Sequence, residues 1–236
     1  MKKQVFVLIG DLLHPEKRMK DLIRRYFDHD KYQVCVFRNL DEICMLSDAP
    51  DLIVNFKDAR DNWRQDTPNH YDEYYMTQIG HYVNVEGCGY IAVHAGCQNV
   101  PKEHPIRVNV LQGGADIPDG GNQFDLNLLY RKTEGASPFG TFTDVTFVPV
   151  VDHPVVKGIE PFTIRDEQME ITIDPGSDAV VLGFAESEIG GKTIGAWARE
   201  AGKGKAVGIA IGHLKTGLTD PGMMKLIQNA ITWCTR

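Results

Sequence analysis

The fold of this chain is decided by one short stretch, Gly89-Tyr90-Ile91-Ala92-Val93-His94-Ala95-Gly96-Cys97-Gln98. Residues 90–93 are apolar or aromatic without a break, which is typical of a strand buried on both faces. His94 stands where this run ends, and Ala95-Gly96 supply the small residues of a tight turn. Open α/β sheets place their ligand sites at the carboxyl ends of central strands. His94 is therefore a candidate site residue, although a hydrogen-bonded histidine of the core fits the same pattern equally well.

Strand and helix patterns alternate ahead of this stretch. Apolar runs at 5–9, 33–37 and 51–56 predict three strands, of which the first is buried. Apolar residues spaced by three and four predict amphipathic helices over 15–27, 40–46 and 71–83. This β-α-β-α order implies right-handed crossovers and a parallel sheet, so we expect an α/β protein. No linker or repeat divides residues 1–236, which predicts a single domain.

The second half of the chain has more strands and fewer helices. Glycine and proline punctuate residues 98–140, which predicts loops with one strand at 108–111, and long loops often form lids over sites. Further strands are expected at 143–151, within 162–173, and at 179–184, 193–198 and 206–211. A last helix should begin at Pro221, with Asp220 as its N-cap.

Composition excludes several classes of function. The 236 residues are 42% hydrophobic and 24% charged, which is ordinary for a soluble globular protein. A net charge of −7 does not indicate a nucleic-acid or anionic-membrane partner. The first apolar run is too short for a membrane span and has no signal-peptide cleavage pattern. Five cysteines without CxxC spacing argue against disulfides and a cysteine zinc site, so we expect a reduced, cytoplasmic protein.

Three histidines share one structural situation. His14, His94 and His213 each follow a predicted strand at the point where the chain turns. Because the carboxyl ends of parallel strands lie along one edge of a sheet, these residues can converge although they are distant in sequence. The alternative is that each histidine caps a turn by hydrogen bonding to the backbone. For His14, at the start of a helix, that alternative is nearly as strong.

An acidic pair, Asp166-Glu167, follows Arg165 in the half-exposed strand expected within 162–173. Neighbours in an extended segment point to opposite sides, so at most one of the two carboxylates should face a site. The other should be solvated or paired with Arg165. A carboxylate near imidazoles can be a general base, an orienting partner or a metal ligand.

Three further motifs favour a structural interpretation. Asp152-His153-Pro154 is better explained as a turn than as a catalytic pair. Cys97 could be a nucleophile with His213 as its base, but it falls beyond the point of the turn, where small buried thiols are common. Gly202-Lys203-Gly204-Lys205 predicts a hairpin turn because the P-loop pattern is lacking, and no GxGxxG motif indicates a nucleotide cofactor.

Taken together, these residues resemble the trehalose-utilisation (ThuA-like) family over most of the chain. The resemblance rests on segments 89–96, 152–159, 166–167, 196–197, 202–205 and 212–213. It implies a flavodoxin-like, class I glutamine-amidotransferase-like fold, a three-layer sandwich with a mainly parallel central sheet. True amidotransferases of this fold carry a cysteine where this chain has His94. The Cys-His-Glu triad is therefore absent, and ammonia production from glutamine is not expected.

The resemblance also implies carbohydrate catabolism, in which trehalose and related disaccharides are processed through 3-keto intermediates. A 3-keto group acidifies the proton at C2, so a general base can remove it and the C1 substituent can leave. Hydration then gives net hydrolysis, whereas return of the proton gives isomerisation. On this hypothesis Glu167 or Asp166 is the base, His94 the acid or oxyanion partner, and His213 and His14 line the site.

Two questions stay open at this point. The histidines and one carboxylate could instead bind a divalent ion such as zinc or manganese, and no other cofactor is indicated. The protein could also be a non-catalytic sugar-binding or regulatory protein, or a cysteine hydrolase. The expected partner is a small-molecule carbohydrate, without nucleic acid or membrane. The sequence names neither the sugar nor the oligomeric state, so a homo-oligomer stays open, although helix 71–83 should pack internally.

Overall fold

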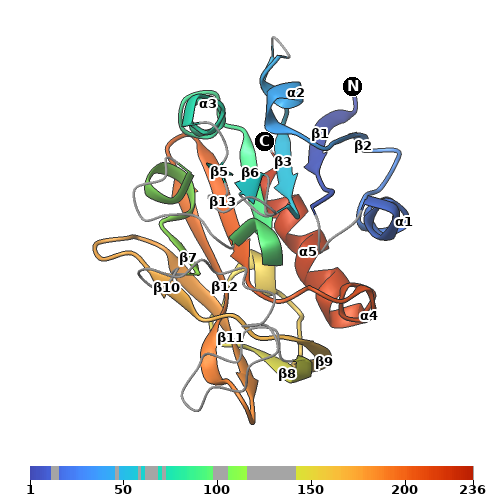
Figure 1. Cartoon of the computed structure of the whole chain (residues 1–236), viewed down its shortest axis with the longest axis vertical. Coiled ribbons are helices and arrows are strands. Elements are labelled where there is room, and N and C mark those ends of the chain that lie inside the picture. The colour runs from blue at the N-terminus through green and yellow to red at the C-terminus, as the bar shows by residue number, and fades with distance from the viewer. Residues whose placement is uncertain are drawn as a thin grey trace.

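The computed structural model describes residues 1–11, 16–45, 48–57, 60–61, 69–70, 73–97, 106–115 and 142–235. These residues form a sheet of nine strands in the order β2-β1-β3-β6-β13-β12-β11-β8-β9 (Figure 1). In its first half every neighbouring pair is parallel. This parallel half consists of β2 (Tyr32–Phe37), β1 (Lys3–Leu8), β3 (Leu52–Asn55), β6 (Gly89–Val93) and β13 (Gly204–Ile209).

The second half of the sheet is antiparallel at every step. This antiparallel half consists of β12 (Gly191–Ala201), β11 (Val180–Ser187), β8 (Phe142–Pro149) and β9 (Phe162–Glu167). Because the direction reverses four times between β13 and β9, strand β9 runs in the same direction as β13 and β6. The carboxyl ends of these three strands therefore point to the same edge of the sheet.

Helices cover both faces of the parallel half. Side chains alternate along each strand, so each strand packs against both helical layers. Val5 and Val7 pack with α1 (Glu16–Tyr26) and α5 (Pro221–Cys234) on one face. Phe6 and Leu8 pack on the other face, with α2 (Leu40–Cys44) and α3 (Glu73–Asn84). These layers confirm the expected α/β sandwich (Figure 1). Within α3, Met76, Ile79, Tyr82 and Val83 are buried, so this apolar face packs internally as predicted.

Short elements complete the described structure. Strand β7 (Gly113–Ala115) pairs with β10 (Ile171–Ile173), and β4 (Arg60–Asp61) pairs with β5 (Asn69–His70). Two 3-10 turns, η1 (His94–Cys97) and η3 (Pro154–Val156), follow β6 and β8, and a short helix, α4 (Lys215–Leu218), precedes α5. Of the loop region 98–140, only 106–115 is described, so the predicted lid lies largely outside the described residues.

Two predicted elements differ from the structure. Residues 108–111 are not a strand but belong to a π-helix, η2 (Arg107–Leu111), whose last carbonyl accepts a hydrogen bond from Trp197 Nε1 at 3.0 Å. The strand expected within 162–173 is divided into β9 and β10, which lie in different sheets. Between them, the buried Gln168 side chain donates to the carbonyl of Ala185 at 2.9 Å, which fixes the break.

Several predicted turns are confirmed. His153 caps η3, with its Nδ1 accepting from the amide of Val155 at 3.2 Å, so the Asp152-His153-Pro154 motif is a turn. Residues 202–203 connect β12 to β13 as a hairpin, with Gly202 at φ +61°. Asp220 caps α5. All five cysteines are free, as their odd number and spacing predict.

Candidate functional site

His94 stands at a sharp turn on the carboxyl edge of the sheet. It follows β6 directly and has φ +45°, a left-handed conformation that is uncommon for residues with a side chain. Two residues later, a Cβ on Gly96 would lie 2.3 Å from the carbonyl oxygen of Asn55, so only glycine allows this close approach to β3. Strained backbone of this kind is concentrated at functional sites, and here it directs an imidazole that is 2% exposed.

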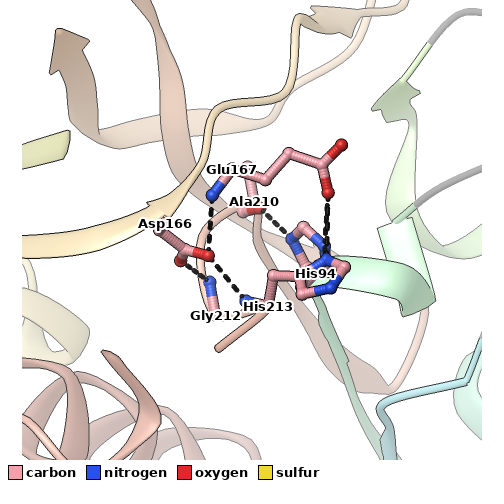
Figure 2. Close-up of polar contacts among 6 residues, drawn as sticks. All are labelled: His94, Asp166, Glu167, Ala210, Gly212 and His213. Carbon is pink, nitrogen blue, oxygen red and sulfur yellow. Dashed lines mark hydrogen bonds and ion pairs between the residues drawn. The ribbon is translucent and has the colours of Figure 1, made fainter. Parts of the chain in front are cut away.

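The hydrogen bond at one ring nitrogen of His94 fixes its tautomer. His94 Nδ1 lies 3.0 Å from the carbonyl oxygen of Ala210. A carbonyl oxygen can only accept, so Nδ1 carries a proton and, in the neutral ring, Nε2 has the lone pair. His94 Nε2 lies 2.9 Å from Nδ1 of His213. Figure 2 shows the two rings next to each other. In the neutral ring, the Nε2 lone pair of His94 therefore points at the second histidine.

His213 is placed by the turn that follows β13. Gly212 has φ +122°, and a Cβ there would lie 2.9 Å from Met223 Cε, so the turn requires glycine. The carboxylate of Asp166 accepts hydrogen bonds from the backbone amides of Gly212 and His213, the latter at 2.9 Å (Figure 2). This contact joins the end of β9 to the end of β13.

Glu167 completes the cluster from the opposite half of the sheet. Its Oε2 lies 2.9 Å from His213 Nδ1 and 3.5 Å from His94 Nε2. The ligand-type atoms of His94, Glu167 and His213 all lie within 4.8 Å of one another. We refer to these three residues as the His-Glu-His cluster. It combines one group from each of three strand ends.

The two neighbouring carboxylates have different surroundings. Only Glu167 faces the imidazoles, as the alternation of an extended strand predicts. The expectation that Asp166 is solvated or paired with Arg165 is wrong, because Asp166 is fully buried and Arg165 instead lies 3.8 Å from Asp144. Asp166 also accepts from the amide of Glu167 at 2.9 Å, so its two oxygens bind three backbone amides. It is a positioning residue.

The carboxylate and the imidazoles of the cluster stabilise each other's charged forms. Burial by itself raises the pKa of Glu167, but hydrogen bonds from His213 and His94 hold that pKa well below its usual value. Burial lowers the pKa of His94, yet Glu167 and Asp166 outweigh this and raise it above its usual value. Glu167 is therefore ionised, and the site is built to hold positive charge beside it.

Phe142 borders the cluster and was not identified from the sequence. It begins β8 directly opposite Glu167 of β9, and its ring centroid lies 5.1 Å from that of His213. The side chain is 36% exposed, whereas His94 and Glu167 are buried. Its position depends on the register between two strands, which no local pattern reveals. The site thus has an exposed aromatic wall beside a polar centre.

Two other candidates from the sequence, His14 and Cys97, have different outcomes. His14 lies outside the described residues. Cys97 is buried, and its thiol donates to the carbonyl of Ala92 at 3.4 Å. Burial raises the pKa of Cys97 to about 12, which keeps the thiol protonated at neutral pH and argues against a nucleophile.

These features define an α/β protein in which a histidine occupies the turn after the central strand and shares its site with a second histidine and a glutamate. The chain belongs to the ThuA family, described as trehalose utilisation, whose model matches residues 13–234. This confirms the resemblance inferred from the sequence motifs. No curated protein matches the chain in sequence.

Solved structures share the fold at low sequence identity. A ThuA-like protein from Parabacteroides merdae has a TM-score of 0.71 at 14% identity, with 100% of this chain and 90% of that chain covered. A β-galactosidase from Rahnella has a TM-score of 0.59 at 12% identity, with 98% and 31% covered. The carbohydrate deacetylase Agd3 has a TM-score of 0.58 at 13% identity, with 100% and 32% covered. This chain thus spans about a third of the last two proteins.

The described helices are also short in relation to a lipid bilayer. Among the residues that the structure describes, no helix is long and apolar enough to cross a membrane.

Proposed function

We propose that this protein is a carbohydrate-catabolism enzyme that acts on 3-keto glycosides or related oxidised disaccharides. The family's association with trehalose utilisation supports a sugar substrate. The observation that carries the proposal is the convergence of two imidazoles and an ionised carboxylate at the carboxyl edge of the sheet. Such a cluster can move a proton and stabilise the negative charge that develops on an oxygen.

The proposed reaction begins with the proton at C2, which the neighbouring C3 ketone acidifies. Glu167 is the better candidate for the base, because both oxygens of Asp166 already accept backbone hydrogen bonds. The electron pair of the C2–H bond forms the enediolate, and then the C1–C2 double bond as the C1–O bond breaks. The leaving oxygen takes a proton, for which His94 is the candidate acid, and His213 supports the anion.

Two outcomes follow from the same intermediate. Addition of water to the enone completes net cleavage of the glycoside, so the enzyme would act as a lyase and hydrolase. Return of a proton to the opposite face of C2 would invert that carbon, which is an isomerisation without cleavage. Phe142 supports either reaction, because an exposed aromatic ring beside a polar centre suits the apolar face of a sugar ring.

The test compares a 3-keto disaccharide of the trehalose type with the same sugar before oxidation. We expect turnover of the keto sugar only, with exchange of the C2 proton for solvent deuterium, and a loss of at least about 100-fold in kcat in His94→Ala and Glu167→Gln. His81→Ala is a matched control, because His81 lies 3.6 Å from Glu86 on the surface and should leave turnover unchanged.

The result that would reject the proposal is full activity of both site variants, or no reaction of the keto sugar with the wild-type enzyme. Binding of a sugar without any turnover would favour the sugar-binding or regulatory alternative. Calorimetric titration with the oxidised and unoxidised sugars distinguishes that case from a protein that does not bind sugars.

A further inference from the structure

We infer that His94 Nε2, His213 Nδ1 and Glu167 Oε2 are the three protein ligands of a divalent transition-metal ion such as zinc or manganese. The inference deepens the proposed function, and its catalytic consequence rests on that function, whereas the binding of the ion does not. Within the part of the chain that the structure describes, this is the one group of at least three histidine, cysteine or acidic side chains placed to share an ion.

The distances between the three atoms match those between ligands that share one metal ion. The separations are 2.9 Å between the two imidazole nitrogens, 2.9 Å from His213 Nδ1 to Glu167 Oε2, and 3.5 Å from His94 Nε2 to the same oxygen. A metal–ligand distance of about 2.0–2.1 Å gives neighbouring ligands about 2.9 Å apart in an octahedron and about 3.4 Å apart in a tetrahedron. An ion can therefore bind all three atoms with little movement of the side chains.

The far side of His94 is arranged as metal-binding histidines usually are. Its Nδ1–H donates to the backbone carbonyl of Ala210, which fixes the ring and directs the Nε2 lone pair to the other ligands. Metal-ligating histidines nearly always donate their second nitrogen in this way. Asp166 has the same positioning role for the other two ligands, since it binds the backbone amides of both Glu167 and His213.

The ligand set indicates a catalytic rather than a structural ion. Three protein ligands leave at least one coordination position for water or substrate, whereas structural zinc sites have four. Two imidazoles and a carboxylate suit zinc, manganese or iron. With the ion bound, Glu167 Oε2 and His94 Nε2 would be ligands in place of base and acid. The ion would polarise the ketone oxygen and stabilise the enediolate, and water held in its open position would take the C2 proton.

The direct test is metal binding by the full-length protein, independent of any substrate. The protein is stripped with a chelator, dialysed and titrated with Zn²⁺ or Mn²⁺ alone in a calorimeter. Co²⁺ provides a visible absorption spectrum that reports the ligand geometry. We expect one ion per chain, with affinity reduced by more than about 100-fold in His94→Ala, His213→Ala and Glu167→Gln, beyond the cost of losing a group that only orients a ligand.

Two further variants should show intermediate and unchanged metal affinity. Asp166→Asn should weaken binding by about 10–100-fold because it only positions the ligands. His81→Ala, which removes a histidine from the surface His81–Glu86 pair, should bind as the wild type does. Thermal unfolding of each variant without metal shows whether it has folded. Added ion should raise the unfolding temperature of the wild type and not of the three ligand variants.

The outcomes for the ion and for the reaction can be separated. Wild-type protein that takes up no stoichiometric ion, or ligand variants that bind as tightly as the wild type, would overturn the metal site. Turnover of 3-keto sugars by fully chelated enzyme would leave the proposed function standing and reject a catalytic ion. A bound ion without any sugar turnover would support the site while rejecting the function.

Discussion

The parallel and antiparallel halves of the sheet contribute to the site in different ways. The parallel half supplies His94 from the end of β6 and the turn to His213 from the end of β13. Strands β3, β6 and β13 are buried on both faces, so these turns are anchored in a continuous core. The antiparallel half supplies Asp166 and Glu167 from β9, which is the outermost strand of the sheet. The site therefore forms where the ends of the central strands β6 and β13 contact the edge strand β9.

The edge strand β9 contacts the turn after β13 although it is not its neighbour in the sheet. In the sheet order, β12, β11 and β8 lie between β13 and β9, yet Asp166 of β9 bonds to the amides that follow β13. The antiparallel half must therefore curve until its last strand returns to the edge that holds the histidines, which the lower part of Figure 1 shows. Besides the β13–β12 pairing, the buried carboxylate of Asp166 connects β9 to the turn after β13, so its removal should weaken the contact between the two halves at the site.

The largest effect is expected from Asp166→Ala, which breaks this connection. The substitution leaves three buried backbone amides without their acceptor, and each unsatisfied group costs about 1–3 kcal/mol. We expect the free energy of unfolding to fall by about 3–5 kcal/mol, with loss of turnover. Urea denaturation measures the first quantity. Asp144→Ala, at a side chain 76% exposed, is the matched control and should change it by less than about 0.5 kcal/mol.

A smaller effect is expected from Gly96→Ala in the parallel half. The new Cβ would lie 2.3 Å from the carbonyl oxygen of Asn55, and this backbone atom cannot turn aside as a side chain can. Overpacking of this kind costs about 1–3 kcal/mol, and because His94 is two residues away, kcat should fall as well. Unchanged stability and activity would show that the turn after β6 is less constrained than its geometry indicates.

Gly80→Ala should stabilise the same half of the molecule that Gly96→Ala destabilises. Gly80 lies inside α3, and a Cβ there would meet nothing within 4 Å. Alanine favours a helix interior over glycine by about 0.5–1 kcal/mol, so this variant should unfold at a slightly higher urea concentration with full activity. Destabilisation would mean that the space around Gly80 is more closely packed than the described residues indicate.

The same division explains what the sequence could predict. The parallel half was predicted well because buried strands and amphipathic helices have strong periodic signals, and His94 and His213 follow from the rule that strand ends share an edge. The separation of roles between Asp166 and Glu167 follows from strand alternation. The burial of Asp166 was missed, because it depends on the curvature of the antiparallel half. The π-helix at 107–111 was missed because a short apolar run fits either a strand or a helix.

Phe142 separates stability from substrate binding. It belongs to the antiparallel half, and it contacts substrate only if the proposed function is correct. Its ring adjoins His213 and is partly exposed, so Phe142→Ala should change stability little. If the ring packs against a sugar, KM should rise about tenfold, equivalent to about 1.4 kcal/mol of binding, with kcat almost unchanged. Phe142→Trp should retain a low KM, because it keeps an aromatic face. Equal KM values for the alanine, tryptophan and wild-type proteins would show that the aromatic wall does not contact the sugar and that recognition depends on other residues.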